Sequence, residues 1–101
     1  MRSERIYQIR RAILSVCKEY ASGSVIAPVK LDDMAEHFAM RRLHPTREEL
    51  LAEWNGLLTL GFIEALKGSD GEYVKISASG LKQINCEEDR DPYIWGASGL
   101  R

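Results

Sequence analysis

The residues best suited to metal or nucleophilic chemistry in this chain are two histidines and two cysteines. His37 and His44 have no cysteine or second histidine at the spacing of a metal-binding motif. Cys17 and Cys86 lie far apart, and isolated thiols of this kind usually stay reduced and behave as small apolar residues. The sequence has no phosphate-binding glycine loop, His-Glu-x-x-His motif or Gly-x-Ser-x-Gly turn. We therefore expect no metal, no cofactor and no enzymatic activity.

Charged side chains are the other group that could carry a function, and they are unevenly distributed. The net charge of the whole chain is only -1. Residues 1–30 carry six basic and two acidic side chains, a net charge of +4. Residues 31–61 have a net charge of -3, and the remainder has -2. The first segment is therefore the basic part of the chain, and the segment after it is acidic.

The length and composition indicate one soluble domain. The chain has 101 residues, of which 45% are hydrophobic and 29% charged, as is usual for a globular protein. No apolar run approaches the ~20 residues that a membrane span needs. The N-terminus leads into an amphipathic pattern and not into the apolar block of a secretory signal. We expect a cytoplasmic protein without a membrane partner.

The first forty residues predict two helices joined by an extended segment. Apolar residues spaced three and four apart predict an amphipathic helix over residues ~4–21: Ile6, Ile9, Ile13, Val16 and Tyr20. The segment SVIAPV contains Pro28, which limits it to a short edge strand or an extended link. The segment LDDMAEHFAM, residues 31–40, predicts a short second helix with acidic residues in its first turn.

The segment HPTREELLAEWNGLLTLGFIEAL contains the best-marked helix. Thr46 and Glu49 form a capping-box pattern, and Gly61 is a typical helix stop. The predicted core face consists of Leu50, Leu51, Trp54, Leu57 and Leu58. FIEAL and EYVKI then read as two strands around the turn KGSDG, and SASGLKQIN as a closing helix.

These elements predict a mostly α protein with a small antiparallel β-hairpin, an α+β fold. The order is helix, strand, helix, helix, strand, strand, helix, and it resembles the winged-helix (winged helix-turn-helix) domain family. LDDMAEHF, TREELLAEWNGLLTLGFIE and YVKISASGLKQI carry the resemblance. The seven-residue link from Ala39 to Pro45 is longer than the tight turn of the sharpest helix-turn-helix motifs. We assign residues 1–86 to this domain, and residues 87–101 to an acidic and then aromatic C-terminal tail.

The resemblance implies a transcription regulator that binds double-stranded DNA, with the third helix in the major groove, the second helix bracing it and the hairpin against phosphates or the minor groove. At 100° per residue, the outward face of that helix is predicted to carry Glu48, Glu49, Ala52, Glu53, Asn55, Gly56 and Thr59. Three carboxylates there would oppose a polyanion, and only Asn55 is a good reader of base edges. The residues that we expect to contact DNA are Arg41, Arg42, His44, Arg47, Asn55, Lys67 and Lys75.

The alternative is a winged-helix protein–protein interaction or dimerisation module without direct DNA binding. The basic first helix could then meet the acidic third helix of a second copy in a homodimer. The tail adds an aromatic cluster suited to an interface: Tyr93, Ile94 and Trp95. That cluster could also dock on its own domain or remain disordered, and the sequence leaves these three alternatives open.

Overall fold

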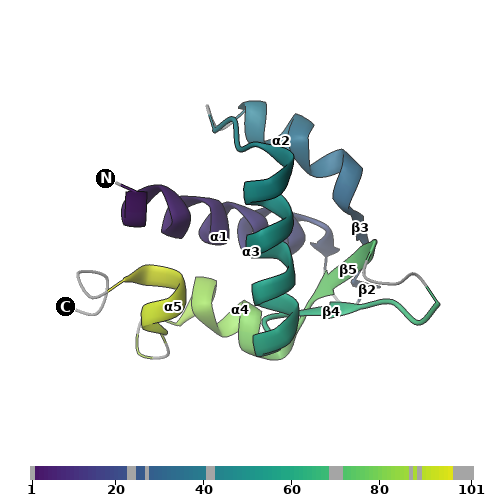
Figure 1. Ribbon diagram of the computed structural model, residues 1–101. Coiled ribbons are helices and arrows are strands. Elements are labelled where there is room, and N and C mark those ends of the chain that lie inside the picture. The colour runs from purple at the N-terminus through teal and green to yellow at the C-terminus, as the bar shows by residue number, and fades with distance from the viewer. Residues whose placement is uncertain are drawn as a thin grey trace.

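A computed structural model describes residues 2–22, 25–26, 28–40, 43–68, 72–86, 88 and 90–96 of the chain. It is mostly helical, with a small three-stranded antiparallel sheet at one end (Figure 1). The expectation of a mostly helical α+β protein is therefore confirmed.

Helix α1, Arg2–Glu19, is the central element of the fold. Helices α2, α3, α4 and α5 and strand β5 all pack against it (Figure 1). Ile9, Ile13 and Val16 are buried, as the apolar spacing predicts. Leu14 and Cys17 lie outside the predicted apolar stripe but are buried as well. The reason is that other elements pack against α1 on more than one face.

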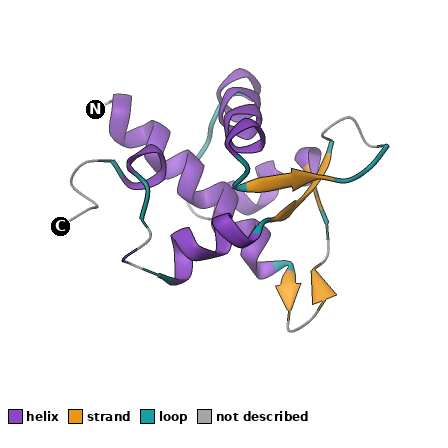
Figure 2. Ribbon diagram, turned by 90° about the horizontal axis from the view of Figure 1, so that it is seen from below, coloured by secondary structure: helices purple, strands orange, loops and turns teal. Residues whose placement is uncertain are grey.

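Two short antiparallel pairings follow α1. β1, Ala21–Ser22, pairs with β2, Val25–Ile26, and the sequence did not predict this small hairpin (Figure 2). β3, Val29–Lys30, lies at the edge of the main sheet, which agrees with the limit that the preceding proline sets.

The second predicted helix is divided. Residues Leu31–Asp33 form the 3-10 turn η1, and Met34–Met40 form α2. Leu31, Met34 and Phe38, which are spaced three and four residues apart, are buried.

Helix α3, Arg47–Leu60, begins and ends where the sequence predicts. The Thr46 hydroxyl accepts a hydrogen bond from the Glu49 backbone N–H, and the Glu49 carboxylate accepts one from the Thr46 N–H, so the capping box is complete. Gly61 ends the helix with a left-handed φ of 82°, a conformation that glycine adopts without strain. Leu50, Trp54 and Leu57 are buried, and Leu51 and Leu58 are half-buried against the core.

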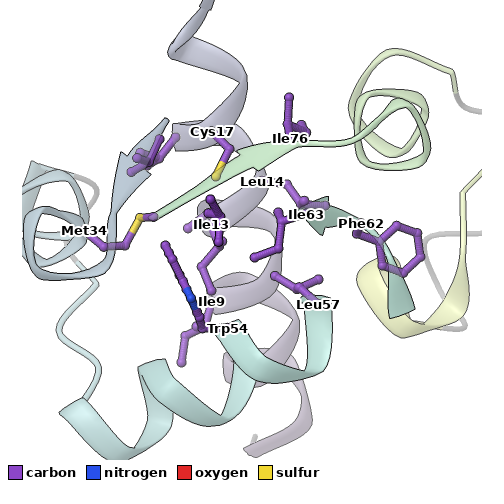
Figure 3. Close-up of a cluster of buried hydrophobic side chains, with 14 of the residues drawn as sticks. Ile9, Ile13, Leu14, Cys17, Met34, Trp54, Leu57, Phe62, Ile63 and Ile76 are labelled. Atoms are coloured by element: carbon purple, nitrogen blue, oxygen red, sulfur yellow. The ribbon is translucent and has the colours of Figure 1, made fainter. Parts of the chain in front are cut away.

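Strands β4, Ile63–Ala65, and β5, Tyr73–Ile76, form the predicted hairpin. The sheet order is β3-β5-β4, so the edge strand β3 pairs with the last strand and not with the one that follows it in the chain. Ile63 and Ile76 face the core together with Leu57 of α3 and Leu14 of α1 (Figure 3).

Two helices complete the described chain. α4, Ala78–Asn85, is capped by Ser77, and α5, Pro92–Trp95, is capped by Asp91. The sequence did not predict α5, although an Asp followed by Pro is a helix-start signal. α5 packs on α1 beside α4 (Figure 1), so this part of the tail belongs to the same core.

Candidate functional site

Two ion pairs join α1 to α3. Arg5 contacts Glu49 through both Nε and Nη2, at 2.9 and 3.1 Å, and Nη2 also donates to the His44 carbonyl oxygen. Arg10 Nε lies 2.6 Å from Glu53 Oε1. The second pair is largely buried, because the side chains of Arg10 and Glu53 keep only 15% and 13% of their exposure. The basic first helix therefore meets the acidic third helix within one chain.

This arrangement corrects the predicted outward face of α3. Glu49 and Glu53 were expected to point to solvent, but both turn toward α1. They lie one position before the buried residues Leu50 and Trp54, at the border of the core face. Helical periodicity alone did not reveal that the neighbouring helix would bring arginines to that border.

The Arg5–Glu49 pair is also part of the α3 cap. The pKa of Glu49 is lowered from 4.5 to about 2, first by the hydrogen bond from Arg5 and then by the backbone N–H of Thr46. The same contact with Glu49 raises the pKa of Arg5. Glu49 thus stays ionised across the physiological pH range and holds the start of α3 against α1.

The solvent-facing strip of α3, which we define as Glu48, Ala52, Asn55 and Thr59, is short of charge. Glu48 is its single carboxylate, and the Thr59 hydroxyl bonds back to the Asn55 carbonyl oxygen at 2.9 Å. Asn55 is exposed, as the sequence-based prediction requires. The strip offers one carboxylate, one amide and two small side chains where three carboxylates were expected.

The predicted basic contacts are divided between the two ends of α3. Arg41 and Arg42 lie outside the described residues. His44 and Arg47 are exposed at the start of α3, where Arg47 Nη1 lies 3.3 Å from Asp32 Oδ1.

Lys67 is exposed after β4, and Lys75 is half-buried on β5 opposite Glu64. Lys67 and Lys75 belong to the hairpin that follows the end of α3 (Figure 1). The helix α3 that lies between the two groups has 14 residues and is therefore roughly 20 Å long.

The aromatic cluster of the tail docks on its own domain. Ile94 is fully buried, which removes it as an interface candidate. Tyr93 stacks on Phe62 with 6.5 Å between ring centroids, and the Arg10 guanidinium lies 3.7 Å from the centre of the Tyr93 ring. Trp95 Nε1 donates to the Gln83 carbonyl oxygen at 3.1 Å. Of the three alternatives that the sequence left open, the structure shows self-docking.

The histidines and cysteines are not brought together. Tyr20 hydrogen-bonds His37 Nε2 at 2.9 Å, whereas His44 is an exposed loop residue. Cys17 is buried and Cys86 is exposed, and burial raises the pKa of the Cys17 thiol to about 12. Within the described ranges, no three His, Cys, Asp or Glu side chains gather as a metal site would require.

A groove that the sequence did not indicate lies between the N-terminal halves of α1 and α3. Its volume is about 350 Å³. Both apolar and charged side chains line it, among them Ile6, Arg5 and Glu48. The small side chain of Ala52 leaves room at this point on α3, and that is the one local signal that could have indicated the groove.

None of the helices in the described part of the chain combines the length and apolar character needed to span a bilayer. Comparisons of the chain with protein-family models, with curated proteins and with solved structures give no match.

Proposed function

We propose that this protein is a winged-helix DNA-binding protein of the transcription-regulator type, which acts by binding and not by catalysis. The arrangement of elements supports the proposal. An edge strand, two helices and a hairpin follow α1 in the chain. In the sheet, the hairpin strand β5 lies between β4 and β3, and β3 is the strand that precedes α2. The order of these elements is the one on which the resemblance to the family rests.

The observation that carries the proposal is the state of the carboxylates on α3. Glu49 and Glu53 are paired with Arg5 and Arg10, so their charge is compensated before any ligand approaches. A reading helix with three uncompensated carboxylates would lose the counterion-release contribution to DNA affinity. With Glu48 alone on the solvent-facing strip, small neighbours allow close approach, and Asn55 can donate to a base edge.

Affinity in this proposal comes from basic residues around the strip. Arg47 and His44 at the start of α3, and Lys67 and Lys75 of the hairpin, would contact phosphates on either side of the groove that the helix enters. Arg41 and Arg42, outside the described residues, are further candidates from the sequence. Their distribution at both ends of α3 suits a helix flanked by two backbone contacts.

The test is a fluorescence-anisotropy titration with a labelled random-sequence duplex at ~50 mM and ~200 mM salt. We expect binding at low salt that weakens steeply at high salt. Arg47→Ala should flatten the salt dependence by about one unit of slope for the lost phosphate contact. Lys82→Ala, an exposed lysine on α4 outside the proposed surface, is the matched control and should leave the slope unchanged. No binding at low salt would refute the proposal.

A second candidate is an interaction or dimerisation module without direct DNA binding. Two large apolar side chains favour it, because Leu60 at the end of α3 is 52% exposed and Tyr73 at the start of β5 is 36% exposed. Light scattering across a range of concentrations would test it: a mass that rises with concentration, and that Leu60→Ser returns to the monomer value, supports this candidate. A monomer at every concentration would exclude the homodimer.

A further inference from the structure

The α1–α3 groove has the dimensions and lining of a small-molecule site. Its volume of about 350 Å³ lies within the range of ligand pockets. Three side chains supply apolar surface: Ile6, Ile9 and Ala52. Four charged side chains border it: Arg5, Glu48, Glu49 and Glu53.

The charge of this lining is not balanced. Glu49 is neutralised by Arg5, and Glu53 by Arg10 from the neighbouring turn of α1. Glu48 is exposed, and within the described part of the chain no ion pair joins it to a basic side chain. The groove therefore combines an apolar surface with one uncompensated negative charge.

We propose that this groove binds a small organic cation, an amine with an apolar body. The body would cover Ile6 and Ala52, and the ammonium would face Glu48. An anion would be repelled by the uncompensated carboxylate of Glu48, and a neutral apolar molecule would leave Glu48 without a counter-charge. The complement of this lining is thus a cation of small size.

Binding there would also alter α3. Glu48 belongs to both the groove and the solvent-facing strip, so a bound amine neutralises the last uncompensated carboxylate that α3 shows to solvent. The amine would then raise the affinity for DNA, an effect that rests on the proposed function. The binding site itself does not depend on DNA.

Hexylamine and hexanol are the matched probes, since they share an apolar body and differ in charge. We would titrate each into ¹⁵N-labelled protein and follow the backbone amides by NMR. Hexylamine should shift the amides of residues 5–9 and 48–53 in a saturable manner at millimolar concentration, and hexanol should bind several-fold more weakly. Equal affinities, or shifts that map outside these two segments, would overturn the proposal.

Three variants sharpen the test. Glu48→Gln should weaken hexylamine binding about threefold, the size expected for one exposed charge pair, and leave hexanol binding unchanged. Ala52→Leu should weaken both, because it fills the groove at an exposed helical position that leucine suits. Glu64→Gln on β4 removes an exposed carboxylate at the far end of α3 and should change neither.

The DNA titration separates this inference from the proposed function. If hexylamine binds and the protein binds no DNA, the groove stands and the regulator proposal fails. If the protein binds DNA and hexylamine shifts no amide, the groove proposal fails alone. If both bind and saturating hexylamine leaves the DNA affinity unchanged, the coupling through Glu48 is refuted.

Discussion

Arg10 joins three helices through one guanidinium group. Its Nε pairs with Glu53 of α3, its Nη1 donates to the Tyr93 carbonyl oxygen of α5 at 2.7 Å, and its plane covers the Tyr93 ring. Arginine is suited to these contacts because its planar guanidinium group can donate hydrogen bonds in two directions while its face stacks on an aromatic ring. A lysine offers only a single charged point.

We therefore expect Arg10→Lys to lower the free energy of unfolding by about 2 kcal/mol, because a largely buried pair is weakened and the Tyr93 carbonyl oxygen loses its donor. Urea denaturation would measure the change. Arg5→Lys is the matched control: its pair with Glu49 is far more exposed, so its loss should be much smaller. Equal losses for the two variants would contradict the central role of Arg10.

The pKa of Glu49 makes a second prediction at this scale. Because that pKa is about 2 in the folded protein against an ordinary value of 4.5, the charged form stabilises the fold fully above about pH 4.5. This stabilisation is lost as the pH falls toward 2. Glu49→Gln should therefore show a shallower loss of stability between these pH values in urea denaturation. NMR titration of the Glu49 side-chain carbonyl carbon should give a midpoint near 2, and Arg5→Gln should raise it.

At the scale of elements, the docking of α5 depends on a glycine of α3. A Cβ at Gly56 would collide with the Tyr93 hydroxyl, so this position must stay without a side chain while Tyr93 occupies its place. Glycine inside a helix otherwise costs about 1 kcal/mol relative to alanine. The contact with α5 explains why the cost is tolerated.

A double-mutant cycle tests this explanation. In the native background, Gly56→Ala should destabilise the protein or give no gain, because the Tyr93 ring must move. In the Tyr93→Phe background the colliding hydroxyl is absent, and Gly56→Ala should raise the free energy of unfolding by up to about 1 kcal/mol. Thermal or urea unfolding of the four proteins gives the interaction energy. An identical effect in both backgrounds would mean that α5 does not dock at Gly56.

The elements that the sequence predicted are those with local signals. The capping box at Thr46 and Glu49, the left-handed Gly61 and the pairing of β4 with β5 depend on local sequence signals, and these features are confirmed. Residues 69–71 of the predicted turn KGSDG lie outside the described residues. The orientation of Glu49 and Glu53 could not be predicted in this way, since it depends on arginines more than forty residues away. The opposite net charges of residues 1–30 (+4) and residues 31–61 (-3) did indicate that these segments attract each other. The dimer alternative placed their contact between two chains, whereas the ion pairs form within one chain.

The tail illustrates the same limit at α5. Asp91 and Pro92 mark a helix start, but only the packing shows that Ile94 is buried. The candidate groove was not predictable either, because it exists only where α1 and α3 meet.

For the whole molecule, the burial of Ile94 makes α5 part of one cooperative core. A chain that ends at Arg90 should lose at least about 3 kcal/mol of unfolding free energy, since it removes Ile94 with its aromatic neighbours. In urea, the midpoint should fall sharply while the transition remains single. Ile94→Val, which shortens the same side chain by one methylene, should cost only about 1 kcal/mol. A truncated protein as stable as the full chain would show that α5 is dispensable.

The central place of α1 also bears on how the protein is made. The ribosome releases α1 first, yet the groups that pair with Arg5 and Arg10 follow some forty residues later, and the Tyr93 carbonyl oxygen follows Arg10 by 83 residues. Contacts of such long sequence separation make folding slow relative to purely local contacts. We therefore expect the nascent chain to hold its basic, apolar first segment without its acidic partner until α3 has emerged, a period in which that segment is open to chaperones and to ribosomal RNA.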